Sequence, residues 1–493
     1  MLTRRELLRK TAQLGAVIAL PSQTSKGQAD DSQGVVVNDA QSQLNSTRVY
    51  RIDRPKSLND IQGTLRDAQR QGRAVSVAGG RHSMGGQQFG KDTILLDMKR
   101  FNRVVRFDMK KGHIEVEAGI QWPELIDYLH RQQRGHRTAW AIREKQTGVD
   151  RVTLAGSLAS NVHGRGLRFP PIIGDVESFV LMDAMGKVHT CSRRENPELF
   201  ALAIGGYGLF GIIAQITLRL VPRMKLERVV EVIAVKNLLP LVAKRIQQGF
   251  LYGDCQYSTD LQTDSQSHAG VFSGYQPVDL NTPIPKQQKQ LSADDWADLY
   301  TLARTDKKKA FERYSKYYLS TSGQIYWSDT HQLATVFEGY REAVDKKRGT
   351  EMITEVYVTK DAFVPFLAQV RKDFLEHKVD MTYGTIRFIE KDTESFLAWA
   401  KERSICIVCN LHVVHTKEGK DKASADFRRI IDRAVQFGGT YYLTYHRWAT
   451  RKQVETCYPR FVEFLRLKKK FDPQERFQSN WYLHYRSLFA DKL

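Results

Sequence analysis

A glycine-rich stretch at residues 78–92, AGGRHSMGGQQFGKD, constrains the fold of this chain more than any other segment. The residues that lead into it, AVSVA, predict a β-strand. Glycines let a backbone turn tightly and approach a ligand closely, and successive amides in such a turn bind phosphate oxygens without a cation. We therefore expect a strand that ends in a dinucleotide-binding turn, with His82 at its apex.

Two nucleotide-binding motifs fit parts of the chain but fail in their context. From Gly85, the spacing of GGQQFGK matches the start of a P-loop, but Asp92 replaces the Ser or Thr that would bind magnesium. The TILLDM that follows predicts a strand, whereas a P-loop leads into a helix. The stretch GGYGLFG at 205–211 has Rossmann-like glycine spacing, yet it follows a predicted helix and precedes a predicted strand, the reverse of the required order. A P-loop NTPase and a Rossmann domain are therefore rejected.

The first 29 residues predict an export signal. Arg4 and Arg5 precede a short apolar run, LGAVIAL, in a pattern that resembles a bacterial twin-arginine signal ending at GQA. The run is far shorter than the roughly 20 apolar residues that span a bilayer. We expect cleavage after Ala29, a polar linker over residues 30–48, and a periplasmic or secreted protein without a transmembrane segment. Because this route exports folded proteins, it also suggests a tightly held cofactor.

The chain is strongly basic, with a formal charge of +20. Residues 1–29 carry five Lys or Arg and one acid, so the remaining chain keeps +16. Such a surface attracts anionic partners. The basic runs DKKKAFER and LRLKKKF predict solvated helix faces and lack the interleaved aromatic residues of a nucleic-acid platform. We therefore expect a small-molecule, anionic glycan or lipid-linked substrate, and no nucleic acid.

Secondary-structure signals divide the rest of the chain into three parts. Over residues 49–222, short predicted strands alternate with helices such as 122–132, which indicates an α+β domain. Residues 223–437 have longer predicted helices and a polar loop at 281–296, which indicates a second domain. Residues 438–493 combine an aromatic strand, within YYLTYHRWA, with an amphipathic helix.

The cysteines and histidines do not form a recognisable metal or disulfide pattern. Five cysteines, an odd number, give no disulfide framework. Cys406 and Cys409 form a C-x-x-C within SICIVCNLHVVH, which predicts a strand. Residues three apart on a strand face opposite ways, so a shared metal or redox site is disfavoured there, and the same holds for His412 and His415.

Four motifs, in this order and spacing, resemble the vanillyl-alcohol-oxidase type of FAD-dependent oxidoreductases. They are GGRHSMGG, GVDRVTLAGSLASNVHGRG, ENPELFALAIGGYGLFGIIAQITLRLVP, and YYLTYHRWA with RLKKKFDPQERFQSN. The resemblance covers about residues 50–222 and 438–480, and it is greatest to the alditol-oxidase, decaprenylphosphoryl-ribose-oxidase and sugar-lactone-oxidase branches. It implies an α+β fold with a two-subdomain FAD-binding domain at 49–222, an inserted cap domain on an antiparallel sheet at 223–437, and a segment at 438–493 that returns to the FAD domain.

The resemblance also implies how FAD is held. His82 takes the position that in several members bonds covalently to the flavin, and a neutral histidine is a suitable nucleophile for that bond. No cysteine lies near VTLAGSLASN in the sequence, so a second covalent bond is not expected. The implied cofactor-binding positions are Gly79, Gly80, Arg81, His82, Ser83, Met84, Gly85, Gly86, Gly148, Thr153, Leu154, Ala155, Gly156, Ser160, Asn161, Val162, His163, Ile212, Ile213 and Tyr442.

The cap departs from the alditol-oxidase pattern. In that pattern one strand carries a carboxylate and an arginine; here Arg387 matches the arginine, but Thr385 replaces the acid. Tyr445 stands where a catalytic lysine is expected, with His446 beside it, and His412 falls near a further substrate contact. We expect a basic group among Tyr445, His446 and His412, with Arg387 stabilising a developing alkoxide. Specificity for sugar alcohols is therefore doubtful.

The implied reaction is removal of hydride from a hydroxyl-bearing carbon of an alcohol, sugar, polyol or lactone, with oxygen, a quinone or a carrier protein as electron acceptor. Two alternatives stay open. One is a flavin-dependent reductase or desaturase on the same fold, and the other is a non-catalytic periplasmic glycan-binding protein.

The export signal gives a direct prediction. Replacing Arg4 and Arg5 by lysine should leave the precursor in the cytoplasm of a bacterial host, because lysine does not reproduce the guanidinium pair. Fractionation followed by N-terminal sequencing measures the outcome. The unmodified chain should appear in the periplasm or medium with a start near Asp30, and equal export of the double-lysine variant would refute the signal.

Overall fold

The computed structural model describes residues 34–136, 138–261, 268–333 and 349–493. The predicted signal peptide at 1–29 and the first residues of the predicted linker lie outside these ranges. Within the described ranges, no helix is both long enough and apolar enough to cross a membrane.

A small parallel sheet supports the glycine-rich turn. Its strands are ordered β3 (Arg51–Asp53), β5 (Ile94–Asp97) and β4 (Val75–Ala78). Helix α2 (Leu58–Arg70) packs on it through Ile61 and Leu65, which recur at helical spacing, and Ser57 caps the helix by accepting from the amide of Asp60. The strand predicted before the turn is confirmed, and the sequence SLNDIQGTLRDAQRQG, whose periodicity predicts a helix, forms α2.

A five-stranded antiparallel sheet forms the second layer of this region. Its order is β10 (Val188–Ser192), β9 (Val176–Met182), β11 (Ile212–Arg219), β7 (His113–Glu117) and β6 (Val104–Asp108). The accompanying helices are α3 (Trp122–Gln132), α4 (Leu154–Ser160) and α5 (Pro197–Ala203). Two short pairs complete the region, β1 (Val35–Val37) with β2 (Thr47–Val49) and β8 (Trp140–Ala141) with β12 (Val221–Pro222).

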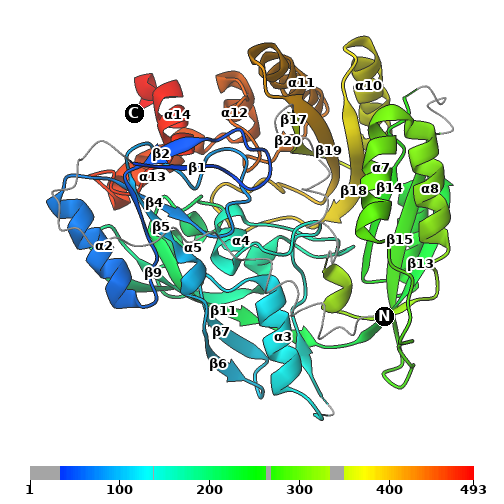
Figure 1. Cartoon of the computed structure of the whole chain (residues 1–493), viewed down its shortest axis with the longest axis horizontal. Coiled ribbons are helices and arrows are strands. Elements are labelled where there is room, and N and C mark those ends of the chain that lie inside the picture. Colours follow the sequence, from blue (N-terminus) through cyan, green and yellow to red (C-terminus); the bar gives the residue numbers. More distant parts are fainter. Residues whose placement is uncertain (1–33, 137, 262–267, 334–348) are drawn as a thin grey trace, which may run out of the picture. The chain divides into compact units, whose positions relative to one another are not determined.

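An eight-stranded antiparallel sheet dominates the remainder (Figure 1). Its order is β16 (Ile325–Trp327), β13 (Lys225–Ala234), β15 (Ala269–Val278), β14 (Tyr252–Tyr257), β18 (Met381–Ile389), β19 (Ser404–Val414), β17 (Gly349–Val358) and β20 (Thr440–Tyr441). Its helices are α6 (Leu238–Gln247), α7 (Ala293–Thr305), α8 (Lys307–Leu319), α10 (Phe363–Glu376) and α11 (Lys417–Gln436). The predicted α+β class with a large antiparallel sheet is confirmed.

The two faces of this sheet differ in chemistry. We call the face that carries Glu351, Glu355 and Arg387 the polar face. Helix α7 contacts this face through a hydrogen bond of 2.7 Å from the Tyr300 hydroxyl to Glu351. The opposite face is covered by α11, whose Phe427 packs against His446 with ring centroids 4.4 Å apart. Alternation along β17 sends neighbouring side chains to different faces, so a single strand serves both the site and the core.

A loop from the first region is inserted between two strands of the large sheet. β14 and β18 pair only at Cys255 with Ile386 and at Gln256 with Thr385. Where the two strands diverge, residues 165–167 hydrogen-bond to β14, with Gly166 paired to Tyr252, and the amide of Glu390 bonds to the carbonyl of Phe169. This insertion brings His163, just before it, to the polar face.

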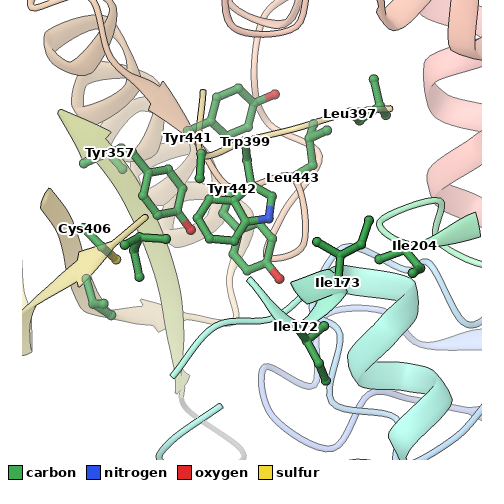
Figure 2. Close-up of a cluster of buried hydrophobic side chains, with 14 of the residues drawn as sticks. Ile172, Ile173, Ile204, Tyr357, Leu397, Trp399, Cys406, Tyr441, Tyr442 and Leu443 are labelled. Atoms are coloured by element: carbon green, nitrogen blue, oxygen red, sulfur yellow. The ribbon is translucent and has the colours of Figure 1, made fainter. Parts of the chain in front are cut away.

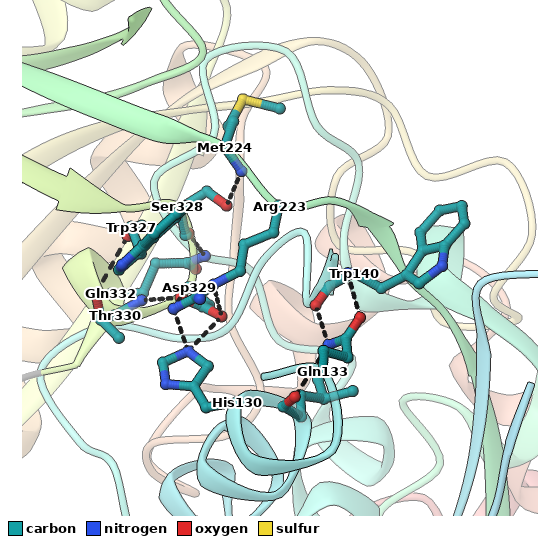
Figure 3. Close-up of polar contacts among 11 residues, drawn as sticks. His130, Gln133, Trp140, Arg223, Met224, Trp327, Ser328, Asp329, Thr330 and Gln332 are labelled. Carbon is teal, nitrogen blue, oxygen red and sulfur yellow. Dashed lines mark hydrogen bonds and ion pairs between the residues drawn. The ribbon is translucent and has the colours of Figure 1, made fainter. Parts of the chain in front are cut away.

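A buried carboxylate joins the two regions at another point (Figure 3). Asp329 is fully buried and caps the short 3₁₀ segment η5 (Thr330–Gln332). Its carboxylate accepts a hydrogen bond from Nε of Arg223 at 3.0 Å and lies 3.0 Å from Nε2 of His130 on α3. Burial alone would raise the pKa of Asp329, but these two partners lower it below its ordinary value.

The C-terminal helices return to the first sheet. They are α12 (Arg451–Cys457), α13 (Phe461–Phe471) and α14 (Asn480–Leu488), and the remaining 3₁₀ turns are η1 (Met98–Arg100), η2 (Ile172–Asp175), η3 (Val235–Asn237) and η6 (Ala490–Lys492). The amide of Val75 bonds to the carbonyl of Arg476, and the amide of Gln478 bonds to the carbonyl of Val75. The end of the chain thus fixes the strand that precedes the glycine-rich turn.

Four local expectations need correction. The aromatic strand ends at Tyr441, and Tyr442–Trp448 is irregular because the Tyr442 hydroxyl bonds to the carbonyl of Ser160. The polar loop at 281–296 ends earlier, because Ser292 and Asp295 form a capping box that starts α7. Residues 154–160, not assigned from the sequence, form α4. The sequence NPELFALA predicts a helix capped by Asn196, but Asn196 donates to the carbonyl of Thr190 and makes no capping bond to α5.

Candidate active site

The glycine-rich turn is pressed against the start of α4. A Cβ on Gly79 would lie 2.0 Å from Oγ1 of Thr153, and a Cβ on Gly80 would lie 2.3 Å from the carbonyl oxygen of Arg151. Residue 81 adopts a left-handed conformation with φ of 62°. Only glycine fits at the first two positions, so the sequence GG specifies how closely the two segments approach.

The cations within this segment are Arg81 and Lys91. Arg81 forms an ion pair with Asp97 at 3.1 Å, and Lys91 is exposed. The chain after Lys91 continues into β5 rather than a helix, and Asp92 has φ of 57°. The P-loop is thereby excluded, and backbone amides are the donors that this turn offers to a pyrophosphate.

The segment around α4 leaves room beside it. Gly148 has φ of 84°, and a Cβ built there would meet no atom within 4 Å. Thr153 caps α4 by accepting from the amide of Gly156 at 3.3 Å. His82 is partly buried in the turn, with its Cδ2 atom 2.8 Å from the position of a Cβ on Gly80. The tight glycine turn fits the close approach of a pyrophosphate to backbone amides.

The other implied cofactor positions lie in two places. Ile212 and Ile213 begin β11 and pair with Met182 and Leu181 of β9. Tyr442 lies in the returning segment, and its hydroxyl donates to the carbonyl of Ser160 at the end of α4. The returning segment is therefore fastened to the α4 region by a side chain that the sequence had assigned to the cofactor site.

The side chains of Tyr357, Trp399 and Tyr442 form an aromatic cluster (Figure 2). The rings of Tyr357 and Trp399 are stacked with centroids 4.5 Å apart, and Tyr442 lies 5.2 Å from Trp399. The His163 ring is 5.2 Å from Trp399. Trp399 also donates its Nε1 hydrogen to the carbonyl of Asn161 at 3.2 Å. These contacts hold the α4 loop and the returning segment against β17.

Glu355 of β17 lies at the centre of the polar contacts in this region. Its Oε2 atom is 2.8 Å from Nε2 of His163 and 3.0 Å from the hydroxyl of Tyr357. Its Oε1 atom accepts from the hydroxyl of Tyr445 at 2.6 Å. The sequence analysis missed Glu355. The signal that could have found it is an acid at an alternating position of GTEMITEVYV, a strand otherwise fit for burial.

Opposite charge keeps this buried carboxylate ionised. Burial alone would raise the pKa of Glu355, but the charge and hydrogen bond of His163, the charge of Arg387 and the Tyr445 hydroxyl together lower it to about 2. Burial and the neighbouring Glu355 raise the pKa of Tyr445 well above its ordinary value. Tyr445 is therefore a neutral phenol at neutral pH, and its proton lies on the bond to Glu355.

Arg387 is buried without a hydrogen-bond partner. Arg387 lies on β18 and is 8% exposed. Its side chain makes no hydrogen bond or ion pair to any of the described residues, and its Nε atom is buried without a partner. Burial would lower its pKa, but the negative charges of Glu355 and Asp254 raise it, so the guanidinium is charged. A buried cation with an unsatisfied Nε is expected where a ligand supplies the acceptors.

The predicted catalytic residues do not all meet. Tyr445 and Arg387 gather around Glu355, as described. His446 lies on the opposite face of the sheet, 3.4 Å from Oγ1 of Thr354, and burial lowers its pKa to about 3. His412 is on the polar face but bonds to Glu351 at 2.9 Å, in a cluster separate from Glu355. The irregular segment after Tyr441 directs Tyr445 and His446, neighbours in sequence, to opposite faces of the sheet.

Cys406 comes close to His163 despite the distance between them in sequence. Its sulfur is 3.9 Å from Nε2 of His163 and 3.6 Å from Oε2 of Glu355. These three residues could offer metal ligands, with their atoms within 4.8 Å of one another. Burial raises the pKa of the Cys406 thiol well above its ordinary value, and Glu355 already accepts three hydrogen bonds. The group is thus a hydrogen-bonded cluster with a protonated thiol.

The C-x-x-C pair behaves as strand parity predicts. Cys406 faces His163, whereas the sulfur of Cys409 is 3.6 Å from the hydroxyl of Tyr257. Both are buried free cysteines whose side chains lie on opposite faces of the strand.

Comparison with known proteins agrees with this geometry. Residues 51–192 match the FAD binding domain family. The chain is 24% identical over 439 residues to L-gulonolactone oxidase of Bos taurus, which covers 86% of this chain and 92% of the relative. It is 27% identical over 175 residues to mitochondrial L-galactono-1,4-lactone dehydrogenase of Arabidopsis thaliana, covering 36% of this chain and 27% of the relative. An uncharacterized oxidoreductase of Rhodococcoides fascians is 32% identical over 168 residues, covering 34% of this chain and 36% of the relative.

The matched FAD-binding domain contains the glycine-rich turn, Gly148 and α4, and the similarity to L-gulonolactone oxidase continues through the eight-stranded sheet. Residues 51–192 form an FAD-binding domain, and the chain is related to the sugar-lactone oxidases, in agreement with the vanillyl-alcohol-oxidase type that the sequence motifs resemble.

Proposed function

We propose that this protein uses FAD to oxidise a hydroxyl-bearing carbon of a sugar lactone. The similarity to L-gulonolactone oxidase supports this substrate class, because it extends over 86% of the chain and so includes the sheet that faces the cofactor turn. Oxygen is the proposed electron acceptor, because this relative is an oxidase. A quinone or carrier protein is the alternative, because another relative is a dehydrogenase.

The observation that carries the proposal is the buried guanidinium of Arg387, which makes no hydrogen bond to the described residues. Desolvating a cation without acceptors is costly, and a lactone supplies hydroxyl and carbonyl oxygens that could satisfy it. When a substrate hydroxyl loses its proton, negative charge develops on the oxygen, and a fixed guanidinium stabilises that charge. Arg387 would therefore orient the substrate and stabilise the developing alkoxide.

FAD, when bound, supplies the hydride acceptor. The chain's own residues would hold it in three places, following the family resemblance. The turn at 79–86 would bind the pyrophosphate through backbone amides, Gly148 and residues 153–163 would surround the ring system, and Ile212 with Ile213 would meet the adenine. The Trp399 and Tyr442 rings would exclude water on the side of the returning segment.

Two further proposals concern the loaded protein. We propose that His82 bonds covalently to the flavin, supported by its place in the turn and by the family motif. We also propose that the protein is exported by the twin-arginine route to the periplasm or medium, supported by the N-terminal motif. The two proposals fit together, because a covalently held cofactor stays bound during export of a folded protein.

The role of Arg387 can be tested by substitution. Arg387→Ala should lower kcat for L-gulonolactone about 100-fold or more with FAD still bound, because it removes an interaction that strengthens as charge develops. Arg403→Ala is the matched control, since Arg403 lies at the start of the neighbouring strand region, is exposed and pairs with Glu390 at 3.1 Å. Equal activity of the two variants, or an effect limited to thermal stability, would contradict the role of Arg387.

The covalent bond to His82 has a simple readout. The acid-precipitated protein should stay yellow and fluoresce as a band in a denaturing gel. His82→Ala should release its FAD on denaturation while the folded variant still binds it, because the pyrophosphate contacts come from backbone amides. Flavin that passes wholly into the supernatant of the unmodified protein would refute the covalent bond, and Ser83→Ala serves as a control for disturbance of the turn.

A further inference from the structure

The N-terminal hairpin lies directly against the glycine-rich turn. This hairpin consists of β1, β2 and the loop at residues 38–46 between them. The amide of Ala40 donates to the carbonyl oxygen of Arg81 at 2.7 Å. The side-chain Nδ2 of Asn45 donates to the carbonyl oxygen of Met84 at 2.6 Å. The loop therefore holds the backbone of the turn at both ends of its central part.

The side chain of Asn45 is fixed in one orientation. It is 5% exposed, and its Nδ2 donates both to the carbonyl of Met84 and to Oδ2 of Asp39 at 3.0 Å. A carbonyl oxygen only accepts hydrogen bonds, so the Nδ2 group must face the turn. Asp39 is fully buried, and its Oδ1 accepts from the amides of Gln41 and Gln43 at 3.0 and 3.1 Å. These bonds of Asp39 shape the loop that carries Asn45.

The returning segment meets the hairpin at the same side chain. Nη2 of Arg447 donates to Oδ1 of Asn45 at 3.5 Å, and Nε2 of Gln87 donates to the carbonyl of Thr444 at 2.9 Å. A Cβ on Gly86, whose φ is 76°, would lie 3.1 Å from Oδ1 of Asn45. Asn45 thus joins the hairpin, the turn and the returning segment.

Three carbonyl oxygens of the turn are occupied by donors of the protein. Those of Arg81 and Met84 accept from the hairpin, and that of Ser83 accepts from Nε2 of Gln88 at 2.7 Å. The N–H group of a trans peptide points away from its carbonyl oxygen. Holding the carbonyl of Arg81 therefore directs the N–H of His82 to the other side, and holding that of Ser83 does the same for Met84.

The turn keeps backbone donors for an anion. Within the ranges that the structure describes, four of its N–H groups make no hydrogen bond, and they belong to Gly80, Arg81, Ser83 and Met84. Such groups are expected where a ligand supplies the acceptors, and a pyrophosphate supplies oxygens of this kind. A flipped peptide would instead point the partial negative charge of a carbonyl oxygen at the phosphate, and the two would repel each other.

We propose that Asn45 and Ala40 are positioning residues for FAD, which hold the carbonyl oxygens of Met84 and Arg81 away from the pyrophosphate and leave the amides of the turn facing it. Asn45 acts through its side chain, and Ala40 acts through its backbone N–H. The role concerns the cofactor alone. It depends neither on which substrate is oxidised nor on a covalent bond at His82.

The dissociation constant of FAD measures this role. The background is His82→Ala, in which FAD has no covalent bond to residue 82 whatever the state of the unmodified protein. The FAD-loaded protein is diluted in steps, and the rise in free-flavin fluorescence gives Kd. Adding Asn45→Ala should raise Kd about tenfold, an effect of the size expected for one buried hydrogen bond.

Thr350→Val is the matched control. Thr350 is 3% exposed and donates to the carbonyl oxygen of Ser42, so valine also removes one buried hydrogen bond from the hairpin but leaves its contacts with the turn in place. Its Kd should stay within about twofold of the background, and thermal unfolding records the loss of stability separately. If Asn45→Ala raises Kd no more than Thr350→Val does, the positioning role is overturned.

Ala40→Pro tests the second contact independently. Ala40 follows Asp39, whose carboxylate caps the next turn through the amides of Gln41 and Ser42, a place that tolerates proline. Proline has no N–H, so the carbonyl of Arg81 loses its donor and Kd should again rise about tenfold. An unchanged Kd would overturn the role of Ala40.

The remaining outcomes also decide the proposal. If Asn45→Ala does not fold, Ala40→Pro is judged against Thr350→Val by the same measurement. If His82→Ala holds no FAD, the flavin content of the single variants purified in parallel replaces Kd. Asn45→Ala should then carry less flavin than Thr350→Val, and equal flavin content would overturn the positioning role.

Discussion

The buried pair of His163 and Glu355 is the interaction on which this structure depends. It joins the loop after α4, in the FAD-binding domain, to β17 of the cap sheet at 2.8 Å. Tyr357 and Tyr445 complete the hydrogen bonds of the carboxylate. Removing one partner of such a pair leaves a desolvated charge and typically costs about 3–5 kcal/mol. The same contact therefore fixes the geometry of the site and contributes to the stability of the interface between the two layers.

The sequence predicted local features better than distant contacts. The turn at residues 78–92, the strands on either side of it and helix α3 could be predicted because their signals are periodicity, glycine spacing and capping, which act over a few residues. Glu355 could not be found this way, because its partners are 192 and 90 residues away in the chain. His446 was predicted as a candidate base because it follows Tyr445, but the irregular segment after Tyr441 turns it to the opposite face.

Strand parity explains how one sheet serves both the core and the site. Thr354 and Glu355 are neighbours on β17, yet the first contacts His446 under α11 and the second contacts His163. A shift of one residue in this strand would exchange the two faces and remove the carboxylate from the site.

Anaerobic reduction of the bound flavin tests the central claim most directly. The purified, FAD-loaded protein is mixed without oxygen with L-gulonolactone, with L-galactono-1,4-lactone or with a sugar alcohol, and the yellow flavin absorption is followed. The account predicts that at least one lactone bleaches the flavin, that air restores the colour, and that the sugar alcohol reacts far more slowly because Thr385 replaces the acid of the alditol pattern. A flavin that stays oxidised with every lactone, or that only the sugar alcohol reduces, would contradict it.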